Sequence, residues 1–421
     1  MLKFLKNYPW LSVFTLGVVL YALFCGVVLD VDSESYISNG IFRSPIYPLL
    51  ISASTKLFGS AVYKPVIVCQ IFLVMLGAIY LSNVLRKAYT LSERTQTVIV
   101  AILVLPYLMK WGNFLLTQGV AYGLLLLVVA HFLQWGFRQS WMNWLWGLFF
   151  LAICVLTRRQ FVFMYPVGVF LVLLIAYVKK QALSKSIACL LVLVGSFFMT
   201  DALEKTYHYV VHGKYTTVPF LGIQLAVAPM YLATEVDANL FQDPLEKDVF
   251  IKAYQKMKQD CSNAECEFGR SLPPYAHYYL NYNRICWEAI WPAARYRPHQ
   301  DAYTVDKMLI GMSKTLIMAH WDKWGSLFLL NVINNMGGYY YTALLLFAFF
   351  GFLVRYQKKQ DAFSLGVVLV LLVNAGNYAL IALVELAFAP YQFYTNTLVL
   401  VVMGLVILKQ MTLSSSKGKL I

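Results

Sequence analysis

Near its N-terminus the chain runs Leu11-Ser-Val-Phe-Thr-Leu-Gly-Val-Val-Leu-Tyr-Ala-Leu-Phe-Cys-Gly-Val-Val-Leu29 and turns at once into Asp30-Val-Asp-Ser-Glu-Ser-Tyr36. The apolar part has the length of a helix that crosses a bilayer. Three carboxylates, Asp30, Asp32 and Glu34, follow it, and burying an unpaired carboxylate at the edge of a membrane is costly. The segment therefore predicts a retained membrane anchor that ends at a functional site.

The composition extends this prediction to the whole chain. Of its 421 residues, 60% are hydrophobic and only 13% are charged, which excludes a soluble domain of this length. Further apolar stretches recur along the sequence, and we expect an all-α polytopic membrane protein of about ten transmembrane helices. The predicted spans are 11–29, 66–85, 95–109, 114–133, 142–156, 161–178, 186–200, 337–354, 362–384 and 395–408.

Three regions follow from these spans. Residues 1–200 form an N-terminal transmembrane bundle that includes an outer loop at 30–65, which we expect to contain amphipathic helices. Residues 201–336 form a large extracytoplasmic segment, and residues 337–421 contain the last spans and a tail. None of the loops on the other side of the membrane from this large segment carries a glycine-rich motif for binding nucleotide phosphates.

The charges predict the orientation. One set of connections holds many basic residues and, as acids, only Glu93 and Asp361, so the positive-inside rule makes this side cytoplasmic together with both termini. The net charge of +14 is therefore an orientation signal rather than a nucleic-acid footprint. These basic residues are Lys3, Lys6, Arg86, Lys87, Arg94, Arg138, Lys179, Lys180, Lys185, Arg355, Lys358, Lys359, Lys409, Lys417 and Lys419.

The large segment shows four local patterns. Val218–Thr234 is apolar but contains two prolines, which suits a membrane-skimming piece or a core segment. Lys247–Lys258 indicates a charged helix, whereas the Pro-Pro and tyrosine-rich run 273–282 indicates irregular structure. Apolar residues recur at helical spacing within 302–335, which predicts an amphipathic helix on the outer leaflet.

Cysteines and histidines give weaker signals. Cys261 and Cys266 are spaced for a disulfide in an oxidising compartment. His208 and His212 share a helix face, yet no acid is spaced to complete a metal site, so a solvated face is the simpler interpretation. No metal ligand set is predicted and no cofactor is certain, although a divalent metal stays open.

Two motifs in the first outer loop carry a family resemblance. Asp32-Ser-Glu-Ser-Tyr36 followed by Arg43-Ser-Pro-Ile-Tyr47-Pro48 resembles the first outer loop of the GT-C superfamily. These are polytopic glycosyltransferases that use polyprenyl- or dolichyl-phosphate sugars. They include relatives of the protein mannosyltransferases and the lipid A aminoarabinose transferase, and the likeness is to glycosyltransferase family 39.

Two later segments are similar to the same family with one replacement each. Thr157-Arg-Arg-Gln160 stands where members often carry an Arg-Pro step, and here Arg159 replaces the proline. Pro390-Tyr-Gln-Phe-Tyr394 stands where relatives often have an Arg-Tyr pair, and here Gln392 replaces the arginine. One large outer segment before the last spans is also the family's layout.

The resemblance implies catalysis at the outer surface of the membrane. Glycosyl transfer from a lipid phosphate needs a base for the acceptor proton and cations for the departing phosphate. Asp32 is the expected base, with Asp30 as the second candidate, and Glu34 is expected to bind acceptor or a metal. Asp32 is alternatively the N-cap of a short helix from Ser33 to Phe42.

Basic and aromatic residues complete the expected site. Arg158 is the preferred phosphate ligand, because a guanidinium grips two phosphate oxygens, and Arg43, Arg159 and Lys110 are further candidates. Snorkelling at a helix end explains such residues equally well. The residues expected to stack on a sugar or line a lipid groove, unless they are interfacial belt residues, are Tyr36, Tyr47, Tyr391, Gln392 and Tyr394.

The sequence thus predicts an inverting GT-C-type glycosyltransferase in a membrane, most simply a bacterial inner membrane, that serves cell-envelope or polysaccharide biosynthesis. Its expected partners are a polyprenyl-phosphate sugar, the bilayer, and a glycan, lipid or protein acceptor. A Wzy-type polysaccharide polymerase is one alternative, although it would not need the acidic first loop. A transporter or lipid flippase is another, although its ionisable residues would lie inside the spans.

Overall fold

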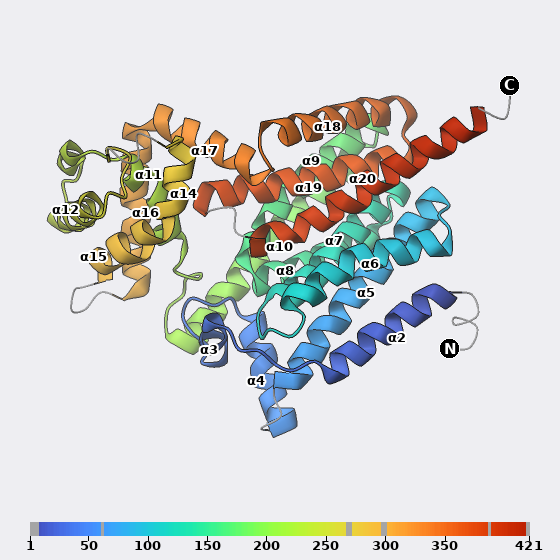
Figure 1. The fold of residues 1–421 in the computed structure, drawn as a ribbon, viewed down its shortest axis with the longest axis horizontal. Coiled ribbons are helices and arrows are strands. Elements are labelled where there is room, and N and C mark those ends of the chain that lie inside the picture. The colour runs from blue at the N-terminus through green and yellow to red at the C-terminus, as the bar shows by residue number, and fades with distance from the viewer. Residues whose placement is uncertain (1–7, 60–62, 267–271, 296–300, 386–388, 418–421) are drawn as a thin grey trace. The chain divides into compact units, whose positions relative to one another are not determined.

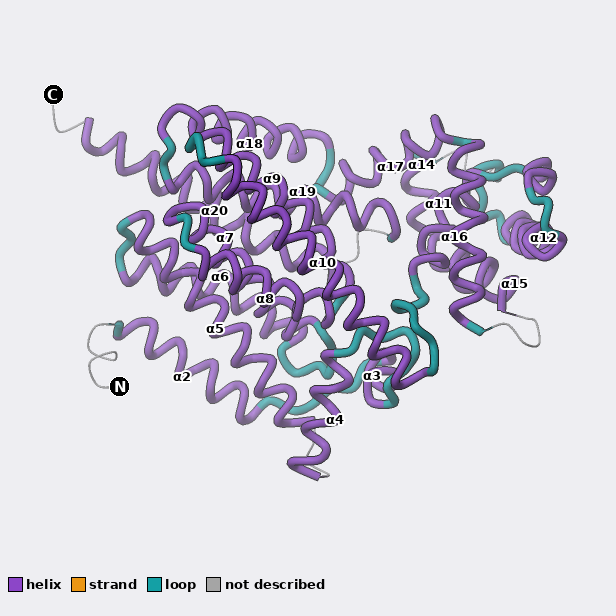
Figure 2. The backbone as a smooth tube through the Cα atoms, turned by 180° about the vertical axis from the view of Figure 1, so that it is seen from behind, coloured by secondary structure: helices purple, strands orange, loops and turns teal. Residues whose placement is uncertain are grey.

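The structure is a computed structural model that describes residues 8–59, 63–266, 272–295, 301–385 and 389–417. These residues are almost entirely helical, and the one β interaction among them is a parallel bridge between Val28 and Phe114 (Figure 2). The predicted all-α architecture is therefore confirmed.

The chain divides into two compact units, which are described separately. The first unit comprises residues 1–207, 344–377 and 392–421, and the second comprises residues 208–343 and 378–391. The predicted extracytoplasmic segment 201–336 lies almost wholly in the second unit. The last predicted spans do not form a region of their own, because most of their residues join the N-terminal bundle.

The helices of the first unit, some of which continue into the second, are labelled in Figure 1. They are α2 (Pro9–Phe24), α3 (Val31–Ile37), α4 (Ile46–Phe58), α5 (Tyr63–Tyr89), α6 (Glu93–Trp111), α7 (Gln118–Arg138), α8 (Trp141–Thr157), the 3₁₀ turn η2 (Arg159–Phe163), α9 (Met164–Val178), α10 (Leu183–His212), α18 (Tyr339–Lys359), α19 (Ala362–Val384) and α20 (Ala389–Lys417).

Helix α7 is the centre of this bundle. Almost all of its residues are buried, and it packs against α5 on one side and α8 on another. Gly77 of α5 and Gly123 of α7 allow the two backbones to approach, since a Cβ atom at Gly77 would lie 2.6 Å from the carbonyl oxygen of Gly123. Small residues at such crossings are the usual means of helix packing within membranes.

Each predicted span overlaps a helix of the structure, but the span at 11–29 is too long because α2 ends at Phe24, and the span at 114–133 begins too early because α7 starts at Gln118. Among the described residues, seven helical segments are long and apolar enough to cross a membrane. Helices α2 and α8 are shorter, with 16 and 17 residues, and α6 carries Glu93, Arg94 and Lys110 near its ends. The first outer loop contains two short helices, α3 and α4, in the region where we predicted amphipathic helices.

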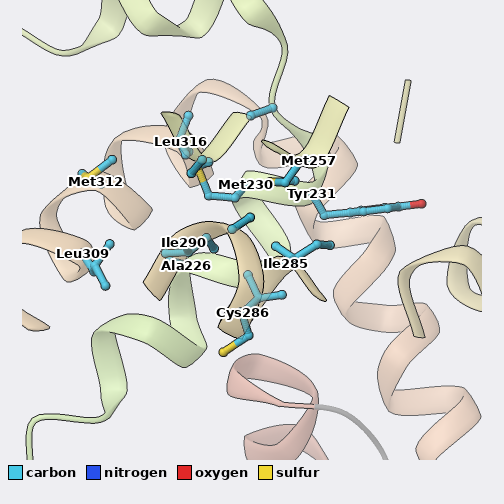
Figure 3. Close-up of a cluster of buried hydrophobic side chains, with 14 of the residues drawn as sticks. Ala226, Met230, Tyr231, Met257, Ile285, Cys286, Ile290, Leu309, Met312 and Leu316 are labelled. Atoms are coloured by element: carbon cyan, nitrogen blue, oxygen red, sulfur yellow. The ribbon is translucent and has the colours of Figure 1, made fainter. Parts of the chain in front are cut away.

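The helices of the second unit surround one apolar core. They are α11 (Leu221–Leu232), the 3₁₀ helix η3 (Glu235–Leu240), α12 (Pro244–Gln259), α14 (Pro274–Asn283), the π-helical turn η4 (Arg284–Ile290), α15 (Trp291–Arg295), α16 (Ala302–Ala319) and α17 (Trp321–Asn335). Figure 3 shows side chains from several of them meeting around Met230 and Ile290.

Three expectations for this unit need correction or refinement. Of the two interpretations of 218–234, the core segment is right, because α11 is buried against α16. The run 273–282 is not irregular, since α14 starts at Pro274, a position where proline is tolerated. The apolar stripe of α16 does not lie on lipid, because Val305, Leu309 and Met312 are buried in the core.

Several polar groups of this unit pair with one another. Cys261 and Cys266 form the predicted disulfide. His208 is buried rather than solvated, and its Nδ1 lies 3.0 Å from the Tyr303 hydroxyl. His320 Nε2 lies 2.7 Å from Asp237 Oδ2. Partial burial favours a higher pKa for Asp237, but the hydrogen bonds from the Thr234 N–H and from His320 outweigh it and lower that pKa.

Candidate active site

The site begins with helix α3, which follows the first long apolar helix. Asp30 is its N-cap, and its carboxylate accepts a hydrogen bond from the Asp32 N–H at 3.2 Å. Ser33 answers by accepting from the Asp30 N–H at 2.8 Å, which completes a capping box. The cap is therefore Asp30, not Asp32, and the helix ends at Ile37 rather than Phe42.

The other two carboxylates of the loop, those of Asp32 and Glu34, take no part in this cap and face outward. Asp32 and Glu34 are both exposed on α3. Asp32 Oδ1 accepts a hydrogen bond from Arg43 Nη2 at 2.6 Å, and no described residue bonds to its second oxygen, Oδ2. One oxygen of this carboxylate is therefore fixed and the other is available to a ligand.

Arg43 organises the loop around this carboxylate. Besides Asp32, its guanidinium donates to Ser35 Oγ at 2.8 Å and to the Tyr36 hydroxyl at 3.2 Å, and it lies over the Tyr36 ring at 4.3 Å. Its side chain is only 19% exposed. Arg43 therefore holds Asp32 and Tyr36 in one arrangement, although N–H groups remain for a ligand.

The wall behind the loop comes from the turn between α6 and α7. The Val28 N–H donates to Asn113 O at 2.9 Å and the Leu115 N–H donates to Val28 O at 3.0 Å. Ser33 Oγ donates to Leu115 O, so side chain and backbone bind the same turn. This turn is thereby fixed against the segment that leads into α3.

Aromatic packing continues the wall. Tyr36 and Tyr47 are buried and meet edge to face, with ring centroids 5.0 Å apart. The Tyr47 hydroxyl donates to Gln70, whose amide donates to Phe114 O at 3.1 Å. Tyr47 is therefore a packing residue with no exposed face for a sugar.

Thr117 connects this loop to Arg158. Its Oγ1 lies 3.5 Å from the Tyr36 hydroxyl and accepts from Arg158 Nη1 at 3.4 Å. Arg158 follows the last residue of α8, and the same nitrogen donates to the buried Tyr394 hydroxyl at 3.2 Å. A continuous path of hydrogen bonds thus runs from Arg43 through Tyr36 and Thr117 to Arg158.

Arg159 points to a different set of partners. Its Nη1 bonds to Glu204, which is fully buried, and its Nη2 lies 3.2 Å from Asp201 Oδ1. Lys205 Nζ also pairs with Asp201, at 2.6 Å. Two carboxylates of α10 therefore compensate the charge of Arg159, which makes it a structural residue rather than a phosphate ligand.

The remaining predicted residues lie outside this path. Lys110 is exposed in the last turn of α6, with its Nζ 4.9 Å from the Trp111 ring centroid. Tyr391 and Gln392 are half-buried in the first turn of α20, on either side of the boundary between the two units. In the described part of the chain, no three His, Cys, Asp or Glu side chains gather as a metal site.

Sequence reasoning missed Thr117. It occupies the N-cap position of α7, and its side chain makes no capping hydrogen bond there. A threonine before an apolar helix looks in sequence like an ordinary cap. Only the structure shows that the Thr117 hydroxyl contacts Tyr36 and Arg158 instead of capping α7.

The class of protein follows from the helices and from this site. The chain is an all-helical integral membrane protein with a carboxylate and two arginines on connected loops. A family model described as dolichyl-phosphate-mannose-protein mannosyltransferase matches residues 43–201, and this match confirms the predicted resemblance to the GT-C superfamily. The matched region includes Arg43, Thr117 and Arg158, whereas Asp32 precedes it.

Solved structures give a more distant likeness. The crystal structure of ArnT from Cupriavidus metallidurans in the apo state is 13% identical, with a TM-score of 0.34, and covers 92% of this chain and 75% of its own. The structure of the same protein bound to undecaprenyl phosphate is 13% identical, with a TM-score of 0.35, and covers 95% and 78%. No curated protein sequence matches this chain.

Proposed function

We propose that this protein is an inverting glycosyltransferase that moves one sugar from a polyprenyl phosphate to an acceptor on the outer face of the membrane. The observation that carries the proposal is the path of hydrogen bonds that joins the Asp32–Arg43 pair to Arg158. It gathers a carboxylate and two guanidinium groups on loops at one end of a membrane bundle. The family match at 43–201 supports the same class of reaction.

The roles of the residues follow from the chemistry of the transfer. Asp32 Oδ2 takes the proton of the acceptor hydroxyl while Arg43 holds Oδ1 in place. The acceptor oxygen forms a bond to the anomeric carbon, and the bond from that carbon to the phosphate oxygen breaks with its electron pair. Arg158 stabilises the negative charge that develops on the departing lipid phosphate.

The proposed substrates stay broad. The donor is a hexose or pentose on a polyprenyl phosphate, in keeping with the undecaprenyl phosphate bound to ArnT. The acceptor is a glycan, a lipid or a protein, and the location that suits this donor is a bacterial inner membrane with both termini in the cytoplasm. Tyr36 lies on the path between the two arginines, and Tyr394 accepts a hydrogen bond from Arg158 at its end.

A direct test measures release of polyprenyl phosphate by the full-length protein in lipid nanodiscs, with a panel of polyprenyl-phosphate sugars as donors. We expect wild-type protein to release the lipid phosphate from at least one donor. Asp32→Asn and Arg158→Gln should each reduce release by about 100-fold or more, since each removes a group that acts on the reacting atoms. Asp322→Asn and Lys56→Gln are matched controls on exposed positions outside the site.

The other classes of protein predict different results in the same assay. Unchanged transfer by Asp32→Asn would refute the base and favour a polymerase of the Wzy type. Movement of a lipid or solute across the bilayer without release of any lipid phosphate would favour a transporter. Release that survives in Arg158→Gln would remove this residue from the phosphate site.

A further inference from the structure

The first unit contains a cavity of about 610 Å³ at the opposite end of its helices from the candidate active site. Its wall includes Tyr80, Asn83 and Lys87 from α5 and Gln134 and Arg138 from α7. Thr117 lies directly before α7 and Arg138 is its last residue. Helix α7 has 21 residues, about 30 Å at 1.5 Å per residue, so Thr117 and Arg138 are separated by about the thickness of a hydrocarbon core.

The lining of this cavity combines polar and apolar surface. Gln134 Nε2 donates to the Tyr80 hydroxyl at 3.2 Å, and Gln96 donates to Asn83 Oδ1 at 2.7 Å. Tyr8 closes one side, and the Arg86 guanidinium lies 4.8 Å from the centre of its ring. The volume falls within the range of small-molecule sites, which are mostly apolar with a few converging polar groups.

The charge of the cavity is positive. Lys87 and Arg138 both line it and both are exposed, and no described acid forms a salt bridge with either of them or with Arg86. The two acids near this end have other partners. Glu93 accepts from the Leu11 N–H at 3.0 Å, and Asp361 accepts from Arg355 at 3.3 Å.

We propose that this cavity binds a phosphate group, presented either by a lipid headgroup or by a soluble phosphorylated molecule. Lysine and arginine are the side chains that recognise phosphate, and the amides of Asn83 and Gln134 supply further donors. Basic pockets between transmembrane helices on the cytoplasmic side are known to take anionic headgroups. The site is separate from the proposed transfer chemistry and does not depend on it.

The test measures binding to the full-length protein in nanodiscs of phosphatidylcholine. One arm adds radiolabelled inorganic phosphate, and the other replaces part of the lipid with phosphatidic acid and counts retained lipid by native mass spectrometry. We expect Lys87→Gln/Arg138→Gln to weaken binding about tenfold or more. The control Lys180→Gln/Lys358→Gln removes the same charge from predicted cytoplasmic positions outside the cavity and should change binding less than twofold.

Each outcome has a meaning. Retention of phosphatidic acid without binding of inorganic phosphate assigns the site to a lipid, and binding of inorganic phosphate shows that a soluble group suffices. Equal losses in both double variants, or no binding above neutral lipid by wild type, would overturn the proposal. Gln134→Phe fills the cavity without changing charge and should also abolish binding, so the proposal is testable even if the double variant unfolds.

Discussion

At the level of single residues, Thr117 is the connection on which the candidate site depends. It is 2% exposed and touches both Tyr36 and Arg158. Thr117→Val keeps the shape and removes the hydroxyl, and a hydrogen bond to a charged group contributes about 1.5 to 3 kcal/mol. We expect sugar transfer to fall about tenfold or more, with little change in thermal stability.

The conservative variant Thr117→Ser keeps the hydroxyl and should restore most of the activity. Steady-state kinetics with a polyprenyl-phosphate sugar would reveal the loss in kcat or in KM. Wild-type rates in Thr117→Val would show that the path through this residue has no role in positioning Arg158.

Arg159 illustrates a structural use of charge. Its partner Glu204 is fully buried, so Arg159→Gln leaves a carboxylate in the bundle without its closest cation. We expect a loss of stability of about 1 to 3 kcal/mol, because the buried Glu204 carboxylate loses a charged hydrogen-bond donor while Arg159 itself is partly exposed. Thermal unfolding in detergent measures it, and Arg159→Gln/Glu204→Gln should recover most of the loss. A single variant as stable as wild type would contradict this role.

The residues that sequence could find are those whose charge is rare in an apolar chain. Asp32, Arg43 and Arg158 stand out for that reason, and the structure connects all three. Distant partners could not be predicted. No sequence pattern near Arg159 indicates that it pairs with Asp201 and Glu204, which lie more than forty residues later. Thr117, in turn, looks in sequence like an ordinary helix cap.

At the level of elements, the capping box of α3 sets the position of Asp32. Asp30→Ala removes the cap, at a cost of about 1 kcal/mol, and should speed hydrogen exchange in residues 31–37. Asp30→Ser can keep the cap and should therefore retain both protection and sugar transfer. If Asp30→Ser were as inactive as Asp32→Asn, Asp30 would be the base instead.

Helices α11 and α16 share a titratable contact. Asp306 Oδ1 accepts from the Gly222 N–H at 2.6 Å, and a Cβ atom at Gly222 would lie 2.2 Å from the Asp306 carbonyl oxygen. Burial raises the pKa of Asp306 to about 6, although the Gly222 N–H lowers it. The folded state then binds a proton that the unfolded state releases, so this contribution to stability is present below pH 4 and is lost as the pH rises through 6.

Asp306→Asn stays neutral at every pH while its oxygen still accepts the Gly222 hydrogen bond. We expect the variant to match wild type near pH 4 and to be more stable at pH 7.5, as measured by thermal unfolding of the full chain at both pH values. A stability difference that does not change with pH would exclude a raised pKa at this position.

The elements themselves follow largely from periodicity. Long apolar runs gave the helices of the bundle, and Lys247–Lys258 gave α12. Periodicity does not reveal what covers an apolar face, because lipid and protein core are equally apolar, and for this reason α16 was expected on the membrane. The prolines of 273–274 suggested a break, whereas they mark the start of α14.

At the level of the whole molecule, the distribution of charge predicts an orientation that can be measured. In a cysteine-light chain, Lys180→Cys should react with an impermeant maleimide only after cells are permeabilised, whereas Asp322→Cys should react in intact cells. Both positions are exposed. Labelling of Lys180→Cys from outside would invert the topology and move the proposed site to the cytoplasm.

The overall architecture was accessible from sequence because a bilayer allows few solutions. Segments that cross lipid must satisfy their backbone internally, so an apolar run of sufficient length is read as a helix. The division into two units was less accessible. Residues 344–377 and 392–421 return to the first unit through packing between segments far apart in the chain, which no local pattern records.

The bridge between Val28 and Phe114 has a consequence for substitutions in this part of the chain. Main-chain atoms alone make it, so the hydrogen bonds that hold the acidic loop beside the turn that carries Thr117 do not depend on the side chains at these two positions.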